Sequence, residues 1–286
     1  MLCYARSGGT VLNRCIACLP NVVMMSEVNP MGGGSGADRK NPCRTVQSQA
    51  KHWYGIDLKS DDFIESVVEL HDICQSQGKH LVLRDWSFVN FAPCPENRGC
   101  PPGRFLMLES LKNKCELITF AFVRNAIDVC ISRGQPVADF AAYYLAYSTA
   151  VIESSAAIFK YEDFCQDPTT TLRAMCKYTD LPYSDSFREY GKFRNVNGDV
   201  QGISRGNRDR AIRPLPRKWI PPGEVAEIEK CDDLIQANHL FGYSSLYNTG
   251  ELEWIWKARA RQAIGCMKRL AQKLEKRGDR SSMIGE

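Results

Sequence analysis

The chain has 286 residues and a formal net charge of +4 at pH 7, with 44% hydrophobic and 24% charged residues. This composition is typical of a globular protein with a substantial core, in one large domain or two small ones. The mild charge points to no polyanion partner, so no nucleic acid is expected. No apolar run reaches the ~18 residues of a membrane-spanning helix.

The N-terminus does not read as a secretory signal, because Arg6 and Arg14 interrupt its apolar residues. We therefore expect a cytoplasmic protein. The first motif begins almost at Met1, which leaves open that a natural N-terminal extension precedes it.

Thirteen cysteines are many for a cytosolic protein. Most fall inside apolar helix or strand patterns, where a free thiol acts as a small buried hydrophobe. Cys15 and Cys18 have a metal-ligand spacing but no second pair, so no metal site is predicted. Cys94 and Cys100 lie in a Pro/Gly loop and can form a disulfide only in an oxidising compartment.

Residues 2–13, LCYARSGGTVLN, read as a strand over Leu2–Ala5, a glycine-rich turn and the start of a helix. This arrangement aims backbone N–H groups and a helix N-terminus at an anion, although an ordinary strand–turn–helix has the same pattern. Gly8 and Gly9 let phosphate oxygens approach the backbone, and Arg6 adds a planar cation. The loop lacks the lysine of a Walker A motif, which disfavours an ATP-Mg²⁺ kinase or hydrolase.

Residues 21–25, NVVMM, read as a second buried strand that runs towards Glu27. A carboxylate at the carboxyl end of a strand lies at the edge where open α/β sheets bind ligands. Glu27 is therefore a candidate general base. A helix cap or a solvated charge at the strand end is the alternative interpretation.

The next elements are predicted as helices over 45–54 and 60–77, the second with Ser60 as N-cap, and a strand over 80–86. That strand ends in Arg84 and Asp85, which either pair with each other or face an acceptor. Residues 91–103 are rich in Pro, Gly and Asn and have the length of a lid or binding loop. A short helix over 106–112 follows.

The strongest strand pattern in the chain covers residues 116–123 and leads directly into Arg124 and a helix that ends near Gly134. Arg124 at the strand end and Ser132 two turns later can hold one anion together. Further along, a helix over 136–155, a strand over 157–161 and a helix over 167–179 are predicted. Five strands alternating with helices indicate an α/β fold, with a mainly parallel sheet flanked by helices on both faces.

Three of these stretches together resemble the sulfotransferases that use 3′-phosphoadenosine 5′-phosphosulfate, a family with a P-loop-like fold. Their first loop is close to Arg/Lys-Ser-Gly-Thr-Thr, and residues 6–10 here are RSGGT. Their second motif is close to Arg-Asn-Pro-x-Asp-x-x-x-Ser-Arg, and residues 124–133 here are RNAIDVCISR. A strand ending in Tyr-Glu-Asp, then Asp-Pro and Leu-Pro, is also typical and occurs here at 161–163, 167–168 and 181–182. The similarity spans residues 2–245.

The resemblance implies a set of donor-binding residues. They are Arg6, Ser7, Gly8, Gly9, Thr10 and Val11 around the phosphosulfate, Arg124 and Ser132 at the 3′-phosphate, Tyr161 near the adenine, and Arg205, Gly206 and Arg208 in a basic loop over the nucleotide.

Departures from the family pattern occur at two positions. Gly9 replaces a hydroxyl residue, so weaker rather than absent donor binding is expected. Ala126 replaces the usual proline at a helix start, which should be tolerated. One branch of the family has a catalytic glutamate about twenty residues after the loop cation. Glu27 stands 21 positions after Arg6, which favours its role as the base.

The resemblance implies a sulfotransferase that moves a sulfuryl group from 3′-phosphoadenosine 5′-phosphosulfate to a hydroxyl or amine, with no metal and with Arg6 and Glu27 as the catalytic residues. The alternative is a P-loop-like nucleotide-binding protein or small-molecule kinase that shares only the fold. The acceptor class and the oligomeric state stay open.

Residues 251–280 form a separate basic segment, with nine Lys/Arg against four Asp/Glu. Their apolar residues recur at helical spacing, from Trp256 to Leu274. We therefore divide the chain into an α/β domain over 1–250 and a basic amphipathic C-terminal helix and tail over 251–286. This helical extension either packs on the domain or contacts a membrane surface or partner.

Overall fold

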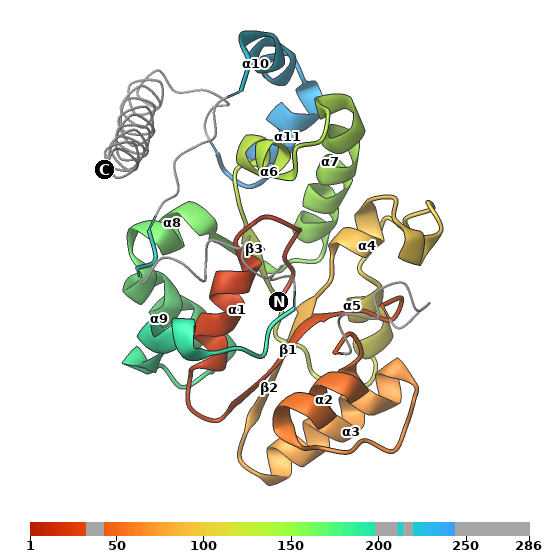
Figure 1. The fold of residues 1–286 in the computed structure, drawn as a ribbon, viewed down its shortest axis with the longest axis vertical. Helices are drawn as coiled ribbons and strands as arrows, with labels where there is room; N and C mark the ends of the chain where they lie inside the picture. Colours follow the sequence, from red (N-terminus) through yellow and green to blue (C-terminus); the bar gives the residue numbers. More distant parts are fainter. Residues whose placement is uncertain (33–42, 198–210, 214–219, 244–286) are drawn as a thin grey trace, which may run out of the picture.

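The computed structural model describes residues 1–32, 43–197, 211–213 and 220–243 (Figure 1). The predicted helical segment over 251–280 lies outside these residues. The elements in chain order are α1 (Gly9–Ala17), β1 (Val22–Val28), α2 (Val46–Tyr54), α3 (Phe63–Ser76), β2 (His80–Asp85), α4 (Phe88–Phe91), η1 (Pro95–Asn97), α5 (Leu106–Leu111), β3 (Phe120–Val123), α6 (Ala126–Arg133), α7 (Val137–Glu153), β4 (Ala157–Lys160), α8 (Tyr161–Gln166), α9 (Pro168–Thr179), η2 (Asp185–Lys192), α10 (Pro222–Glu229) and α11 (Asp232–Leu240).

Parallel pairing organises the strands. β1 pairs with β2, and β3 pairs with β4, in both cases in parallel. The first residues of the chain lie between the two pairs. The Met1 nitrogen donates to Leu83 O at 2.8 Å and Leu2 N donates to Phe120 O at 2.8 Å. The predicted strand over Leu2–Ala5 is thus reduced to a short segment with one parallel bridge, Leu2 to Ala121, that joins the two halves.

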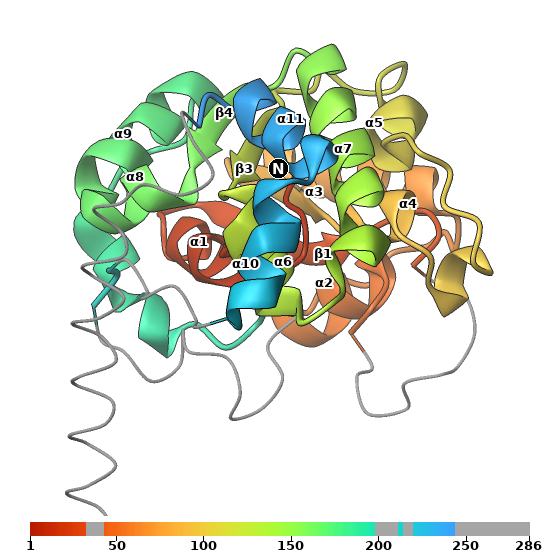
Figure 2. The same ribbon diagram turned by 90° about the horizontal axis from the view of Figure 1, so that it is seen from above.

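Helices cover both faces of this parallel array, as the view from above shows (Figure 2). Alternate residues of β3 point to opposite faces, as the pleat of a strand requires. Phe120 and Phe122 pack in a core with α1, α8 and α9, whereas Ala121 and Val123 pack in a core with α6, α7 and α11. A third core joins β1 and β2 to α2, α3 and α5. The predicted α/β class is confirmed.

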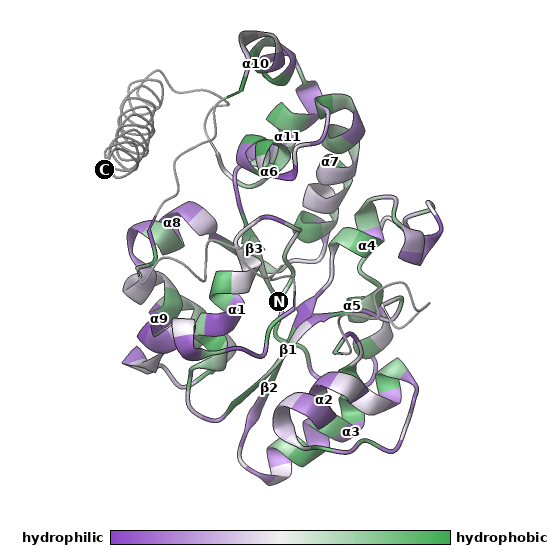
Figure 3. Cartoon of the chain, viewed as in Figure 1, coloured by the Kyte–Doolittle hydropathy of each residue, from purple (hydrophilic) through white to green (hydrophobic). Residues whose placement is uncertain are grey.

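The helices are amphipathic, and Figure 3 shows hydrophobic and hydrophilic residues alternating around α2 and α3. α2 begins as the sequence predicts, with Thr45 and Ser48 in a reciprocal capping box. α3 begins later than predicted, because its N-cap is Asp62 and not Ser60. Asp62 Oδ1 accepts from Ile64 N at 2.8 Å, while Ser60 Oγ donates to Glu65 Oε2 at 2.7 Å. A carboxylate satisfies two free N–H groups of the first turn here, which explains the later start.

Two further predictions on the strands are corrected. The strand predicted over 116–123 is confined to Phe120–Val123, because its partner β4 begins only at Ala157 after α7. Leu117 and Ile118 are therefore 36% and 52% exposed. Tyr161 does not end a strand, since it begins the unpredicted helix α8.

The cysteines described by the structure are free thiols, including Cys94 and Cys100. Within the described ranges, no group of three metal-ligating side chains comes together, and Cys15 packs from α1 into the core. No helix among the described residues is long and apolar enough to cross a membrane.

The two halves of the predicted strand should differ in their effect on stability. We expect Phe122→Ala to lower the free energy of unfolding by about 3–5 kcal/mol, because it removes a buried ring and leaves a cavity. Phe122 is fully buried against the Phe164 ring, with centroids 5.7 Å apart. Ile118→Ala is the control and should change stability by no more than about 0.5 kcal/mol. Equal losses in urea denaturation would contradict this arrangement of β3.

Candidate functional site

The loop between the first strand segment and α1 is anchored by an aromatic cluster around Tyr4, the residue just before it. The Tyr4 ring contacts the rings of Phe140, Tyr144 and Tyr147, with centroids 5.0–6.1 Å apart. Ser7 N donates to Tyr4 O at 3.2 Å, which turns the chain sharply just after this anchor. The position of the loop is therefore set by core packing, and not by the loop alone.

The loop then enters α1 through a left-handed glycine. Gly8 has φ +84°, and a Cβ on it would collide with the Tyr161 ring, so both conformation and space require glycine here. α1 has no side-chain cap and no acidic residue in its first turn. The first turn of α1 itself therefore supplies no negative charge to the positive end of the helix dipole, which suits an anion.

The structure brings the two sequence motifs together at this loop. Arg6 Nε donates to Ser132 Oγ at 3.1 Å, across 126 residues of sequence. Arg124 Nη1 donates to Arg6 O at 3.2 Å, and the Arg124 guanidinium lies 4.7 Å above the centroid of the Tyr161 ring. Arg6 thus links Arg124 to Ser132, and that these two residues hold one anion together stays a prediction.

The helix that carries Ser132 is fixed at its start. Asn125 caps α6 by accepting from Ile127 N at 3.0 Å, and Asn238 Oδ1 accepts from Ala126 N at 2.7 Å. Alanine is therefore accommodated at the position where the family has proline, and its N–H has a partner. Asn125 N donates to Glu162 Oε1 at 3.2 Å, which ties α6 to the turn that carries Tyr161.

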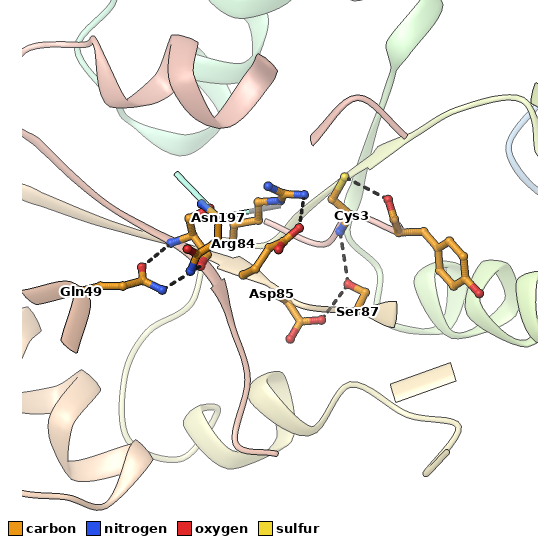
Figure 4. A network of polar contacts seen from close by, with 9 residues as sticks. Cys3, Gln49, Arg84, Asp85, Ser87 and Asn197 are labelled. Atoms are coloured by element: carbon orange, nitrogen blue, oxygen red, sulfur yellow. Dashed lines mark hydrogen bonds and ion pairs between the residues drawn. The ribbon is translucent and has the colours of Figure 1, made fainter. Parts of the chain in front are cut away.

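Glu27 lies at the carboxyl end of β1, as predicted, and it is paired. Its φ of +53° and a register shift between Met25 and Val28 turn it out of the regular strand. Arg84 Nη2 donates to Glu27 Oε1 at 2.8 Å (Figure 4), and the side chains are 4% and 20% exposed. Glu27 Oε2 has no hydrogen bond within the described part of the chain, so one carboxylate oxygen stays available.

Arg84 thus pairs with Glu27 and not with Asp85, a partner that the sequence did not indicate. Asp85 is fully buried and accepts from Ser87 Oγ at 2.7 Å and Asn29 Nδ2 at 3.0 Å. Burial raises the pKa of the Asp85 carboxyl to about 6. The alternative in which Asp85 faces an acceptor does not fit this enclosed position.

The residue before Glu27 is held by a polar network that sequence patterns do not reveal. Gln49 Oε1 accepts from Ser26 N at 2.7 Å, and Ser26 Oγ accepts from Asn197 N at 3.0 Å (Figure 4). Asn197 Nδ2 also donates to Cys43 O at 2.6 Å. These contacts join segments up to 171 residues apart, so no local spacing could have indicated them.

The cations outnumber the carboxylates around the loop. Arg84 Nε, Arg84 Nη1 and Arg124 Nε are buried and have no hydrogen-bond partner in the described ranges of the chain. The pKa of Arg133 is lowered by its burial, and Arg6 nearby adds to this effect. Unpartnered donors of this kind are costly in a folded protein, and an anionic ligand would satisfy them.

The other predicted site residues are less informative. Ser7 is completely buried, so its side chain belongs to the packing of the loop. Thr10 and Val11 lie half-buried in the first turn of α1, and Tyr161 lies against Gly8 with its phenol pKa raised by burial. Contact of Tyr161 with an adenine stays a prediction. Arg205, Gly206 and Arg208 lie outside the described residues.

Comparison with known proteins identifies the fold. No protein-family model matches the chain. No curated protein matches it either. Among solved structures, it is similar to the sulfotransferase domain from the curacin biosynthetic pathway, with a TM-score of 0.53 at 11% identity over 86% of this chain and 97% of that one. A second structure, the sulfotransferase domain from the Synechococcus PCC 7002 olefin synthase, aligns with a TM-score of 0.47 at 12% identity over 91% and 93% of the two chains. The likeness to the curacin-pathway domain shows that this chain has the α/β fold of a sulfotransferase domain.

Proposed function

We propose that the chain transfers a sulfuryl group from 3′-phosphoadenosine 5′-phosphosulfate to a hydroxyl or amine acceptor. The observation that carries this proposal is the junction of Arg6, Ser132 and Arg124 at the start of α1. It unites the loop that resembles a phosphosulfate site with the motif that resembles a 3′-phosphate site. The sulfotransferase fold of the chain agrees with this reading of the site.

The donor fits the charges at this edge of the sheet. It carries anionic groups at two places, the 5′-phosphosulfate and the 3′-phosphate. The start of α1 and Arg6 would hold the first group, and Arg124 with Ser132 would hold the second. The unpartnered Arg124 Nε supports this assignment, because an anion supplies the acceptor that the protein does not.

The reaction is an in-line displacement at sulfur. The acceptor oxygen or nitrogen forms a bond to sulfur while the bond from sulfur to the bridging phosphate oxygen breaks. Charge builds on the leaving phosphate oxygen and on the equatorial oxygens, much as in phosphoryl transfer. Arg6 and the N–H groups that begin α1 stabilise this charge. Glu27 Oε2 takes the acceptor proton, while Arg84 holds Oε1.

The competing function is a nucleotide-binding protein or small-molecule kinase with the same fold. The two functions differ in their ligand. A sulfotransferase should bind adenosine 3′,5′-bisphosphate without Mg²⁺ and in preference to ATP, whereas a kinase should prefer ATP with Mg²⁺. Calorimetric titration with both ligands decides between them, and a screen with labelled donor then identifies the acceptor class.

Arg124→Ala should weaken binding of adenosine 3′,5′-bisphosphate by about 1.5–3 kcal/mol, the range for a hydrogen bond to a charged group. Binding of AMP should change much less, because AMP lacks the 3′-phosphate. Isothermal titration calorimetry measures both affinities.

Arg188→Ala is the matched control, since it removes the same charge at η2. Ser186 on η2 donates to Cys18 O at the far end of α1, away from the loop. Equal losses of bisphosphate and AMP affinity in Arg124→Ala would rule out the 3′-phosphate role.

Glu27→Gln should leave bisphosphate affinity unchanged and lower turnover by about 10²–10⁴-fold, the scale of general base catalysis. The amide oxygen can still accept from Arg84, so the local structure should be kept. An acceptor of low pKa should restore part of the lost turnover, because it needs no base.

Arg6→Ala is the comparison variant, and the same acceptor should not rescue it, because charge stabilisation is still missing. Near-normal turnover of Glu27→Gln with its true acceptor would show that Glu27 is not the base. Of the other titratable residues His52, His80 and Asp85, His52 would then be tested next. Of these, Asp85 is buried and His80 begins β2, at the end opposite Arg84.

A further inference from the structure

Position 9 is glycine for a reason of space and not of backbone conformation. A Cβ built on Gly9 would lie 2.5 Å from Cys3 Sγ, 2.9 Å from Arg84 Nη2 and 3.0 Å from Arg84 Nε. Unlike Gly8, Gly9 has an ordinary helical φ, so other residues could adopt its conformation. Arg84 and Cys3 thus fill the volume in which a side chain at position 9 would begin.

Arg84 is enclosed in this volume and has hydrogen-bond donors that are not used. Its side chain is 4% exposed, and its guanidinium lies near Cys3 (Figure 4). Among the residues that the structure describes, only Nη2 is paired, with Glu27 Oε1, whereas Nε and Nη1 have no hydrogen-bond partner. A buried cation beside the positive end of α1 is unfavourable by itself. One carboxylate offsets part of this cost, and an anion at the loop would offset the rest.

We propose that Gly9 and Arg84 are a matched pair, in which the missing side chain at position 9 makes room for the Arg84 guanidinium to bind the phosphosulfate of the donor. Arg84 then supplies the donors that a hydroxyl at position 9 would otherwise provide. It also holds the Glu27 carboxylate at the same place. Binding of the phosphosulfate by Arg84 rests on the proposed function. The steric relation between Gly9 and Arg84 does not depend on it.

The pairing predicts that Gly9 does not simply weaken the site. A serine at position 9 adds a hydroxyl but displaces the Arg84 cation, so it should lower activity instead of raising it. Gly9 departs from the family pattern, and Arg84 lies near the end of β2. A side chain at position 9 should therefore keep activity only if Arg84 is replaced at the same time.

A double-mutant cycle tests the steric part. Gly9→Ser, Arg84→Ala and the double variant are compared in a Cys3→Ala background, which removes the sulfur contact from the comparison. Gly9→Ser should lower the melting temperature strongly with Arg84 present and much less without it, because contacting residues are not additive. Additive shifts in melting temperature would overturn the pairing, whatever the protein catalyses.

Chemical rescue tests the functional part in the otherwise unchanged chain. Arg84→Ala should lower turnover by about 10²-fold or more, the scale for loss of a preorganised donor. Added guanidinium ion should restore at least about a tenth of the lost turnover by entering the vacated space. Rescue should fail in Gly9→Ser/Arg84→Ala, since the serine side chain occupies that space.

If the Gly9→Ser variants do not fold, Arg84→Met replaces them as the comparison that fills the space without charge. Absence of rescue in Arg84→Ala, or equal rescue in the filled variant, would overturn the inference. Failure of the proposed function looks different: the unmodified chain would neither bind adenosine 3′,5′-bisphosphate nor transfer sulfuryl groups, while the melting cycle still reports on the pair.

Discussion

The parallel backbone pairing of the first residues, between β2 and β3, is the constraint on which the rest of the structure depends. Met1 bonds to Leu83 on one side and Leu2 bonds to Phe120 on the other. Because these neighbouring segments run in parallel, their carboxyl ends meet at one edge. Arg84 lies near the carboxyl end of β2, while the loop from Arg6 and Arg124 follow the other two segments. The register of a few backbone bonds thus assembles three cations from distant parts of the sequence.

The position of the glycine-rich loop at this edge depends on the tightly packed side chains next to it. Tyr4 is locked in an aromatic cluster, and the Tyr161 ring lies where Gly8 has no side chain. Arg124 also lies over that ring and donates a hydrogen bond to the Arg6 carbonyl. Packing therefore fixes the backbone N–H groups and the arginines relative to each other before any ligand arrives, which reduces the ordering cost of binding.

Sequence patterns were informative where the determining contacts are local. The helix after Thr45 and the carboxyl-end positions of Glu27 and Arg124 all followed from short local patterns. Sequence patterns failed where contacts with distant segments determine the structure. The exposure of Ile118 depends on where β4 begins, and the partner of Arg84 depends on the turn at Glu27. Neither fact is encoded in a neighbouring residue, so the sequence left the partner of Arg84 open and overextended the strand.

The polar network at Ser26 has a consequence for how the molecule is made. Asn197 supplies hydrogen bonds to Ser26 and to the Cys43 carbonyl, which lie 171 and 154 residues before it in the sequence. During synthesis from the N-terminus, β1 can pair with β2 long before Asn197 has left the ribosome. The backbone next to Glu27 must wait for that single late residue. The core around β1, β2, α2 and α3 can thus form early in translation, while the backbone beside Glu27 is completed only after Asn197 has been made.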